Sequence, residues 1–260
     1  FYTGYRTYPD DGDDPMGRTP SGYLWDAALA KGKRVRIYGE FCDDAKNRVI
    51  PTPKDWLEVW RARGTKRFTF DAVPSIRSMR SLHHPNYLYW PLLQSDQHRA
   101  DLFVEEYTRL SKANRVPHLM VLSLPSDHTE GLSPQYPKPR SMVADNDLAL
   151  GRIVDAVSHS PQWAKTAIFV IEDDAQAGPD HVDGHRSVYM AISPWTRRGY
   201  VDSNFYTTVT MLRTIEKMLG LDPMNRMDAL TPPMLACFAE KPDPRPYDHV
   251  PNRIPLDDMN

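Results

Sequence analysis

The sequence predicts an α/β protein with three layers, in which helices cover both faces of a mostly parallel sheet. The first observation is three apolar runs, each the length of one strand: "HLMVLSLP" at 118–125, "TAIFVIED" at 166–173 and "SVYMAISP" at 187–194. The second is that segments with the apolar spacing of amphipathic helices alternate with most of these runs. Strands that are apolar throughout are typical of sheets buried on both faces, so we expect an αβα arrangement.

The elements before these runs follow from local patterns. Residues 1–20 show no apolar periodicity and are expected to form an irregular lead-in. Helical spacing predicts a helix over 21–33, with Ser21 as its N-cap and Gly32 as its stop. Alternating apolar residues then predict a strand over 34–41.

Four further helices are predicted from apolar residues at helical spacing, at 54–64, 95–115, 141–161 and 205–221. We expect Ser141 to cap the third of these and Val143 to face the core. In the fourth, we expect Met218 to face the core and Gly220 to end the helix. Residues 68–91 are aromatic but follow no period, and are expected to be irregular.

The composition limits the classes of function. A formal net charge of -2 gives no electrostatic reason to expect nucleic acid as a partner, and no apolar run approaches the roughly 18 residues of a membrane span. Cys42 and Cys237 are far apart in the sequence. They could form a disulfide, but two thiols without one are the favoured alternative. We expect a single α/β domain over 1–260, with a Pro-rich tail at 241–260 that either wraps around its surface or is loose.

Polar residues gather where two of the predicted strands end. Asp127, His128 and Glu130 follow the strand at 118–125, and a longer acidic stretch follows the strand at 166–173. In open α/β sheets, sites form beyond the carboxyl ends of strands, so we expect both clusters along one edge. The second cluster consists of Glu172, Asp173, Asp174, Asp180, His181, Asp183 and His185.

Neighbouring carboxylates repel one another when ionised, so the acidic cluster predicts a divalent cation. Carboxylates with imidazoles suit zinc or manganese, and carboxylates alone suit calcium or magnesium. The alternative is that these aspartates only cap turns, as aspartate does in most loops. A Gly-rich phosphate loop, an H-E-x-x-H segment and a G-x-S-x-G segment are all absent from the sequence.

Five blocks, in this order, carry a resemblance: "PSDHTEG", "MVADNDLALGRIVDAV", "AIFVIEDDAQAGPDHVDGHRS", "ISPWTRRGYVDS" and "TMLRTIEKMLGL". With them the chain resembles the phosphoesterase family of the alkaline phosphatase superfamily. It is most similar to the bacterial branch often fused behind a β-propeller, and acid phosphatases and phospholipase C enzymes are more distant relatives. The resemblance covers roughly 21–238 and implies an alkaline-phosphatase-like fold.

The resemblance also implies roles for individual residues. The metal ligands it implies are Asp173, Asp174, Asp180 and His185. The catalytic residues it implies are Asp127, His128 and His181. Lys138 and Arg140 are candidate phosphate contacts by position alone. The implied activity is metal-dependent hydrolysis of phosphoric esters, with a small phosphate ester or a lipid as substrate and a periplasmic or secreted location. The alternatives are a non-catalytic binding or structural subunit, and a sulfatase or nucleotide pyrophosphatase of the same superfamily.

Family members carry an upstream Glu-Asn element and an upstream Ser or Thr nucleophile, and this sequence shows neither. We therefore expect the chain to be the C-terminal portion of a catalytic domain. The missing N-terminal segment is the expected partner, as a separate chain or as upstream sequence. Because residues 1–20 offer no element to cover an open sheet edge, we expect this chain to fold only with that segment bound.

Overall fold

The computed structural model describes residues 19–42, 47–173 and 186–260. The contacts divide the chain into two compact units, Phe1–Ala156 with Asp248–Asn260, and Val157–Tyr247. Helices and paired strands occur in both, and one pair is parallel, so the α/β class is confirmed. The single domain expected from the sequence stays a prediction.

The first unit contains α3 (Asp96–Lys112) and most of α4 (Pro139–Ser158), the two longest helices within the described residues. Its elements in order are α1 (Leu24–Ala30), β1 (Val35–Tyr38), β2 (Arg48–Ile50), α2 (Trp56–Arg61), β3 (Thr69–Asp71), α3, β4 (Leu119–Leu122) and α4, whose last two residues belong to the second unit. The predicted helices and strands of this region are confirmed. The short strands β2 and β3 were not predicted, because three residues are too few to show a period.

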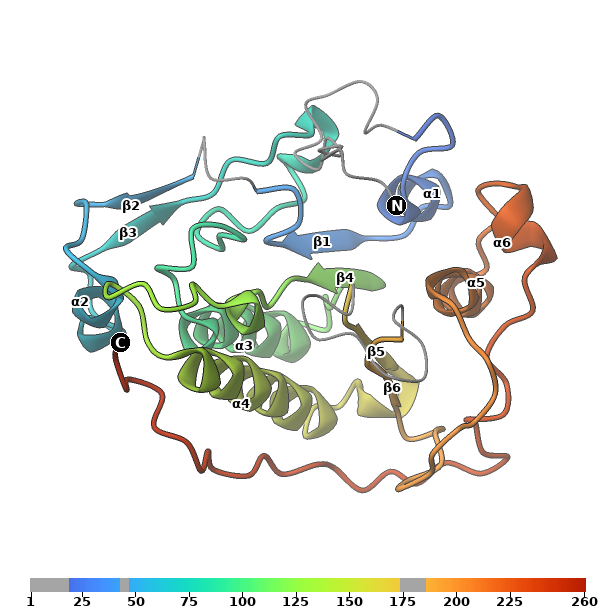
Figure 1. Ribbon diagram of the computed structural model, residues 1–260. Coiled ribbons are helices and arrows are strands. Elements are labelled where there is room, and N and C mark those ends of the chain that lie inside the picture. The colour runs from blue at the N-terminus through green and yellow to red at the C-terminus, as the bar shows by residue number, and fades with distance from the viewer. Residues whose placement is uncertain (1–18, 43–46, 174–185) are drawn as a thin grey trace, which may run out of the picture. The chain divides into compact units, whose positions relative to one another are not determined.

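Two strand pairs form in the first unit. β1 and β4 are parallel and side by side, with Val35 opposite Leu119 and Tyr38 opposite Leu122 (Figure 1). β2 and β3 are antiparallel, and Val49 lies opposite Phe70 in the centre of the pair.

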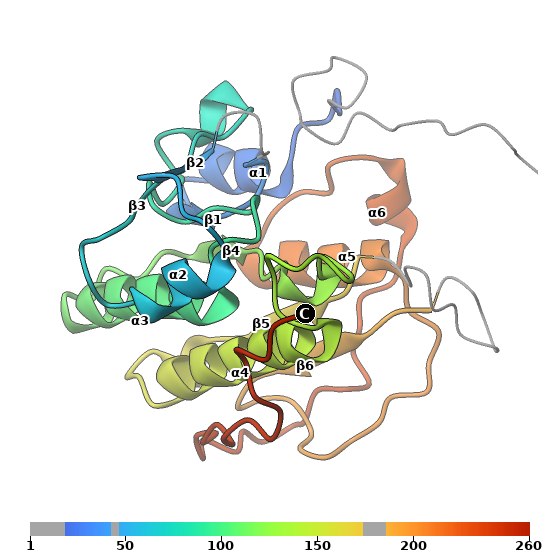
Figure 2. The ribbon, with the colours of Figure 1, turned by 60° about the vertical axis from the view of Figure 1, so that its left-hand side comes forward.

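The core of this unit forms on β1. Ile37 and Tyr38 are fully buried, and the Tyr38 ring meets the Phe103 ring of α3 edge-on at 5.3 Å between centroids. α3 and α4 run side by side (Figure 2), and Arg152 of α4 donates to the Asp101 carboxylate of α3 at 2.5 Å. The two helices thus provide a rigid support beside the strands.

The second unit contains a 3-10 turn at Trp163–Lys165, β5 (Ile168–Ile171), β6 (Tyr189–Ile192), α5 (Thr208–Leu219) and α6 (Arg226–Leu230). β5 and β6 are both predicted strands, and they pair antiparallel. Met211, Met234 and Cys237 form the buried cluster of this unit, against which Phe169 and Ala191 pack. None of the helices in the described ranges is long and apolar enough to cross a membrane.

Some helix ends differ from the prediction. The N-cap of α1 is Tyr23 rather than Ser21, because the Asp26 carboxylate accepts from the Tyr23 N–H and fixes the first turn there. α4 begins at Pro139, a residue suited to the first helical position, so Ser141 lies inside the helix and does not cap it.

Two residues that were predicted to face the core are exposed, and one predicted helix end is confirmed. Val143 and Met218 were expected in the core but are exposed, because each lies at the border of its apolar stripe. Gly220 ends α5 in the left-handed conformation with a φ of 68°, as predicted.

Candidate functional site

The carboxyl ends of β1 and β4 meet at one edge of their parallel pair. Ser123, which follows β4, donates its N–H to the Tyr38 carbonyl at 3.0 Å. The Ser123 hydroxyl lies 3.1 Å from Oε2 of Glu40, which follows β1. This is the edge at which open α/β sheets form their sites. Glu40 and Ser123 were not predicted, because neither belongs to a recognisable motif.

A close approach of the backbone shapes this edge. Gly39 has a φ of 90°, and a Cβ added there would lie 3.2 Å from both the Ser123 side chain and the Tyr87 ring. Any other residue would need that conformation and that space, so glycine is required at this position. The Gly39 N–H donates to Nε2 of His83 at 2.9 Å.

His83 and Cys42 are both buried behind the edge. His83 Nδ1 donates to the His84 carbonyl at 2.9 Å, so Nε2 is an acceptor, and the Cys42 sulfur lies 3.2 Å from it. Burial lowers the pKa of His83 to about 4, which keeps the ring neutral. Cys42 and Cys237 form no disulfide. The contact therefore packs the Cys42 side chain against a neutral imidazole.

The polar turn after β4 has a strained backbone. Ser126–His128 forms a 3-10 turn, and Thr129, which ends it, has φ 60° and ψ 171°. That region of backbone conformation is nearly restricted to glycine, so a β-branched residue there costs roughly 1–3 kcal/mol. Such strain persists only where the surroundings enforce it, and it is concentrated at functional sites.

His128 lies at the exposed end of this turn. Its ring meets the Trp90 ring edge-on, with 4.8 Å between centroids. Nδ1 lies 3.2 Å from the Thr129 carbonyl, and because a carbonyl only accepts, Nδ1 carries the proton of this bond. In the neutral ring, Nε2 is then the nitrogen that can take a proton or bind a cation.

A buried carboxylate of α4 holds the turn from one side. Asp145 accepts from the N–H groups of Asp96 and Gln97, at 2.7 and 3.2 Å, and these belong to the first turn of α3. It also accepts from the Ser126 hydroxyl at 3.0 Å. The N-terminus of α3 favours negative charge at this position. Asp145 therefore joins two helices to the turn.

A second buried carboxylate, Asp96 of α3, holds the same serine. It accepts from the Ser126 N–H at 3.0 Å and from Nη1 of Arg99 at 2.8 Å. Arg99 is also fully buried and donates to the Leu88 carbonyl at 2.7 Å. Burial raises the pKa of Asp96 to about 7 and raises the pKa of Asp145 as well.

Asn146 connects this buried pair to Asp127. Its Nδ2 donates to Asp127 Oδ1 at 3.1 Å, to Asp96 Oδ2 at 3.2 Å and to the Leu124 carbonyl at 2.5 Å. Asp127 Oδ2 makes no hydrogen bond with the residues that the structure describes. We call Asp96, Asp145 and Asn146 the bracket, because together they hold the Ser126–His128 turn.

The bracket was not predicted from the sequence, although the position of Asp145 could have indicated it. Asp145 lies three residues after Met142 and four before Ala149, and both of these are buried. That spacing puts a carboxylate on the apolar face of α4, where an acid needs partners.

The predicted metal ligands follow β5 in the second unit. Asp173 is exposed, and beside it the Glu172 N–H donates to the Val188 carbonyl at 3.1 Å. Asp174, Asp180, His181 and His185 lie outside the described residues. Since Asp127 and His128 belong to the first unit, the expected common edge stays a prediction.

The two candidate phosphate contacts both pair with one carboxylate, and their contact with phosphate stays a prediction. Lys138 Nζ and Arg140 Nη2 lie 2.8 and 2.7 Å from the oxygens of Asp258. Asn260 Nδ2 donates to the carbonyls of Gly131 and Ser133, at 3.1 and 3.0 Å. The end of the tail is therefore fixed against the loop that follows the turn.

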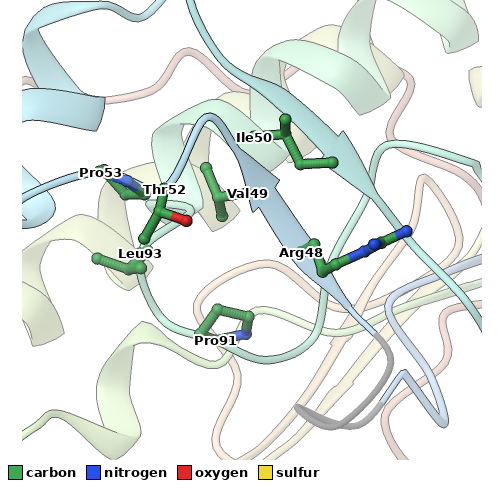
Figure 3. A pocket seen from close by; sticks show the side chains of 7 residues that line it. All are labelled: Arg48, Val49, Ile50, Thr52, Pro53, Pro91 and Leu93. Carbon is green, nitrogen blue, oxygen red and sulfur yellow. The ribbon is translucent and has the colours of Figure 1, made fainter.

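A groove of about 450 Å³ lies beside β2 in the first unit (Figure 3). It is lined by Arg48, Val49, Ile50, Thr52, Pro53, Pro91 and Leu93. The cation on its wall, Arg48, already pairs with Asp71 at 2.9 Å. None of the predicted site residues that the structure describes lines this groove, so we do not assign the candidate site to it.

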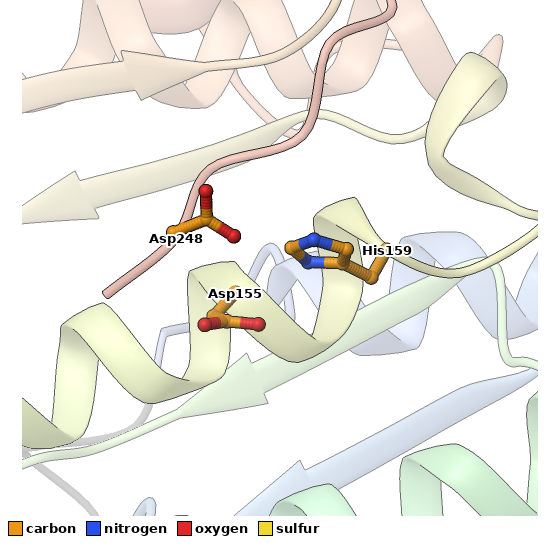
Figure 4. A group of neighbouring side chains, drawn as sticks. All are labelled: Asp155, His159 and Asp248. Atoms are coloured by element: carbon orange, nitrogen blue, oxygen red, sulfur yellow. The ribbon is translucent and has the colours of Figure 1, made fainter.

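Two carboxylates and an imidazole, those of Asp155, Asp248 and His159, are drawn in Figure 4. Asp155 and Asp248 belong to the first unit and His159 to the second, so we assign no metal site to them. Asp155 Oδ2 also lies 2.6 Å from Nδ1 of His249.

The protein is thus of the α/β class, with a polar turn of strained backbone at the carboxyl edge of its parallel strand pair. Residues 81–222, more than half of the chain, match the Phosphoesterase family, and the chain belongs to that family. The match includes α3, β4, the bracket, the Ser126–His128 turn and β5. None of the curated proteins matches the chain. Membership supports phosphoric ester hydrolysis at the level of the family.

Proposed function

We propose that the chain hydrolyses phosphoric esters with the help of a divalent metal ion, and that the Ser126–His128 turn takes part in the reaction. The observation that carries the proposal is the strained turn held by the bracket, within the region that matches the Phosphoesterase family. It presents one carboxylate oxygen of Asp127 and one imidazole nitrogen of His128 at the strand edge.

The metal ligands in this proposal are those expected from the sequence. Asp173 has an exposed carboxylate, and Asp174, Asp180 and His185 lie outside the described residues. A donor set of carboxylates with an imidazole fits zinc or manganese, and carboxylates alone fit calcium or magnesium. A bound divalent ion would supply polarisation of the phosphoryl oxygens and a lower pKa of the attacking hydroxyl.

The residues of the chain would handle protons and orientation. In this proposal His128 Nε2 takes up a proton, and the doubly protonated ring then gives that proton to the leaving oxygen or donates a hydrogen bond to a phosphoryl oxygen. Asp127, beside it, would orient the group that His128 serves. His181 shares these roles in the proposal. A small phosphate ester or a lipid is the proposed substrate, and a periplasmic or secreted location is proposed with it.

The full-length protein should hydrolyse a chromogenic phosphate monoester or diester, and the assay tests metal and histidine separately. Chelation should abolish turnover, and adding back zinc, manganese, calcium or magnesium singly should restore it. His128→Asn should lower kcat about 100-fold or more, because a positioned acid or base contributes at least that much.

His118→Asn is the matched control, because Asn can still accept the bond that the Arg34 N–H gives to His118 Nδ1. Full activity after complete metal removal would refute the metal requirement. A folded protein that hydrolyses no ester would favour the non-catalytic subunit, and one that cleaves only sulfate esters or only nucleotide pyrophosphates would favour the related enzymes.

A further inference from the structure

We propose that Asn146 is a positioning residue that orients the Asp127 carboxylate for the reaction. The inference rests on the proposed function, because it assumes that the Ser126–His128 turn takes part in catalysis. Asn146 lies inside α4, a 20-residue helix, so its side chain extends from a rigid element.

The chemistry of its partners assigns the orientation of the Asn146 amide. Asp127 Oδ1, Asp96 Oδ2 and the Leu124 carbonyl surround one end of the amide. All three are acceptors, so only the nitrogen can lie there, and its two hydrogens serve three oxygens. An amide oxygen in that place would face three oxygens with no hydrogen between them.

The same nitrogen fixes both ends of a short segment. Leu124 is the second residue after β4, and Asp127 lies three residues further, in the turn. By holding the Leu124 carbonyl and Asp127 Oδ1 together, Asn146 sets the distance between the strand end and the carboxylate. With Oδ1 held, Asp127 can turn only Oδ2 toward a substrate.

The two buried carboxylates complete the support. Ser126 gives its N–H to Asp96 and its hydroxyl to Asp145, so both the backbone and the side chain of one residue are fixed. The strained Thr129 needs such surroundings, because its backbone would otherwise relax. Asn146 is the member of the bracket that hydrogen-bonds to Asp127, and it therefore restrains the Asp127 carboxylate.

The test compares Asn146→Asp and Asn146→Ala with the wild type in the full-length protein. Asn146→Asp keeps the shape but replaces the donor with an oxygen facing Asp127 and Asp96. With a chromogenic phosphate ester, we expect kcat to fall about 10- to 100-fold, as a misplaced reacting group does, while KM changes less than about threefold. Asn86→Asp is the matched control, because it removes a single Nδ2 bond, to the Phe70 carbonyl at 2.7 Å, and its partner is not in the turn.

Hydrogen exchange provides a readout that needs no activity. The N–H groups of Ser126, His128 and Thr129 are all hydrogen-bonded and should exchange faster in both Asn146 variants, but not in Asn86→Asp. A double mutant with Asp127→Asn should lose little beyond Asp127→Asn alone, because Asn146 acts through that carboxylate.

Additive losses of kcat, or unchanged exchange at the turn, would overturn the inference. A wild-type protein that cleaves no phosphate ester would overturn the proposed function instead. In that case the exchange experiment still decides whether Asn146 holds the turn.

Discussion

Asp127 after β4 and Asp173 after β5 have different surroundings. After β4, Ser126 is bound by two buried carboxylates of α3 and α4, and Asp127 is bound by Asn146. After β5, the carboxylate of Asp173 is exposed. The turn after β4 is preorganised by hydrogen bonds to buried groups, whereas Asp173 after β5 is in contact with solvent.

β4 and β5 differ little in burial, because β4 has one buried and three half-buried residues. The larger difference lies in the strands that pair with them, since none of the residues of β6 is buried. β1, which pairs with β4, has three of its four residues buried, and Ile37 is fully inaccessible. β5 has three half-buried residues, and Ile171 is exposed. The position of a turn in the first region therefore depends on groups deep in the protein, so substitutions there should have the larger effects.

The largest expected effect comes from removing the buried cation Arg99 of the first region. At pH 8, where Asp96 is mostly ionised, Arg99→Met should lower the free energy of unfolding by about 3–5 kcal/mol, because it leaves the Asp96 carboxylate without its charge partner. It also leaves the Leu88 carbonyl without a donor. Denaturant unfolding measures the change.

Arg109→Met on the same helix is the control, because Arg109 is exposed and pairs with Glu106 at the surface. It should cost less than about 1 kcal/mol. Equal losses of unfolding free energy in the two variants would contradict this prediction. The buried pair of Arg99 and Asp96 would then contribute no more to stability than a surface pair.

The second prediction concerns pH, and its sign follows from the pKa of Asp96. Burial raises that pKa to about 7, so between about pH 4 and pH 7 the native state holds a proton that the unfolded chain has released. The contribution of Asp96 to stability therefore declines as pH rises through this window. The buried histidines act in the opposite direction, because burial lowers the pKa of His83, His84 and His98 to about 4.

Asp96→Asn isolates this contribution. The difference in unfolding free energy, wild type minus variant, should fall by roughly 1 kcal/mol for each pH unit between pH 4 and pH 7. Denaturant unfolding at four pH values measures it. A difference that stays constant, or rises with pH, would show that Asp96 is ionised throughout and that Arg99 and its other donors outweigh its burial.

The sequence could predict only those features that depend on neighbouring residues. The strands 119–122, 168–171 and 189–192 and the long helices were predicted, because apolar runs and helical spacing are local signals. Asp127 and His128 were predicted for the same reason, as polar residues directly after an apolar run.

The groups that hold Asp127 were not predicted, because they come together only in the fold. Asp96 is 49 residues from Asp145, and the bond between them joins two helices. Each looks like an ordinary helical acid in the sequence. Glu40 and Ser123 meet only because β1 and β4 are parallel neighbours.

The smallest expected effect lies in the loop after the turn, where the support is exposed. Asp258 pairs with Lys138 and Arg140, and these bonds hold the pKa of the Asp258 carboxyl below its ordinary value. The contribution of Asp258 to stability is therefore present at neutral pH, and it is lost as the pH falls and the carboxyl is protonated. Asp258→Asn should lower Tm by no more than about 4 °C at low salt, and the shift should shrink at 1 M salt because exposed charges are screened.

Arg99→Met should show no comparable dependence on salt, since its ion pair with Asp96 is fully buried. Thermal melts of both variants at low and high salt measure the contrast. A shift for Asp258→Asn that persists in high salt would mean that Asp258 acts through hydrogen bonds held away from water. The end of the tail would then resemble the bracket rather than an ordinary surface pair.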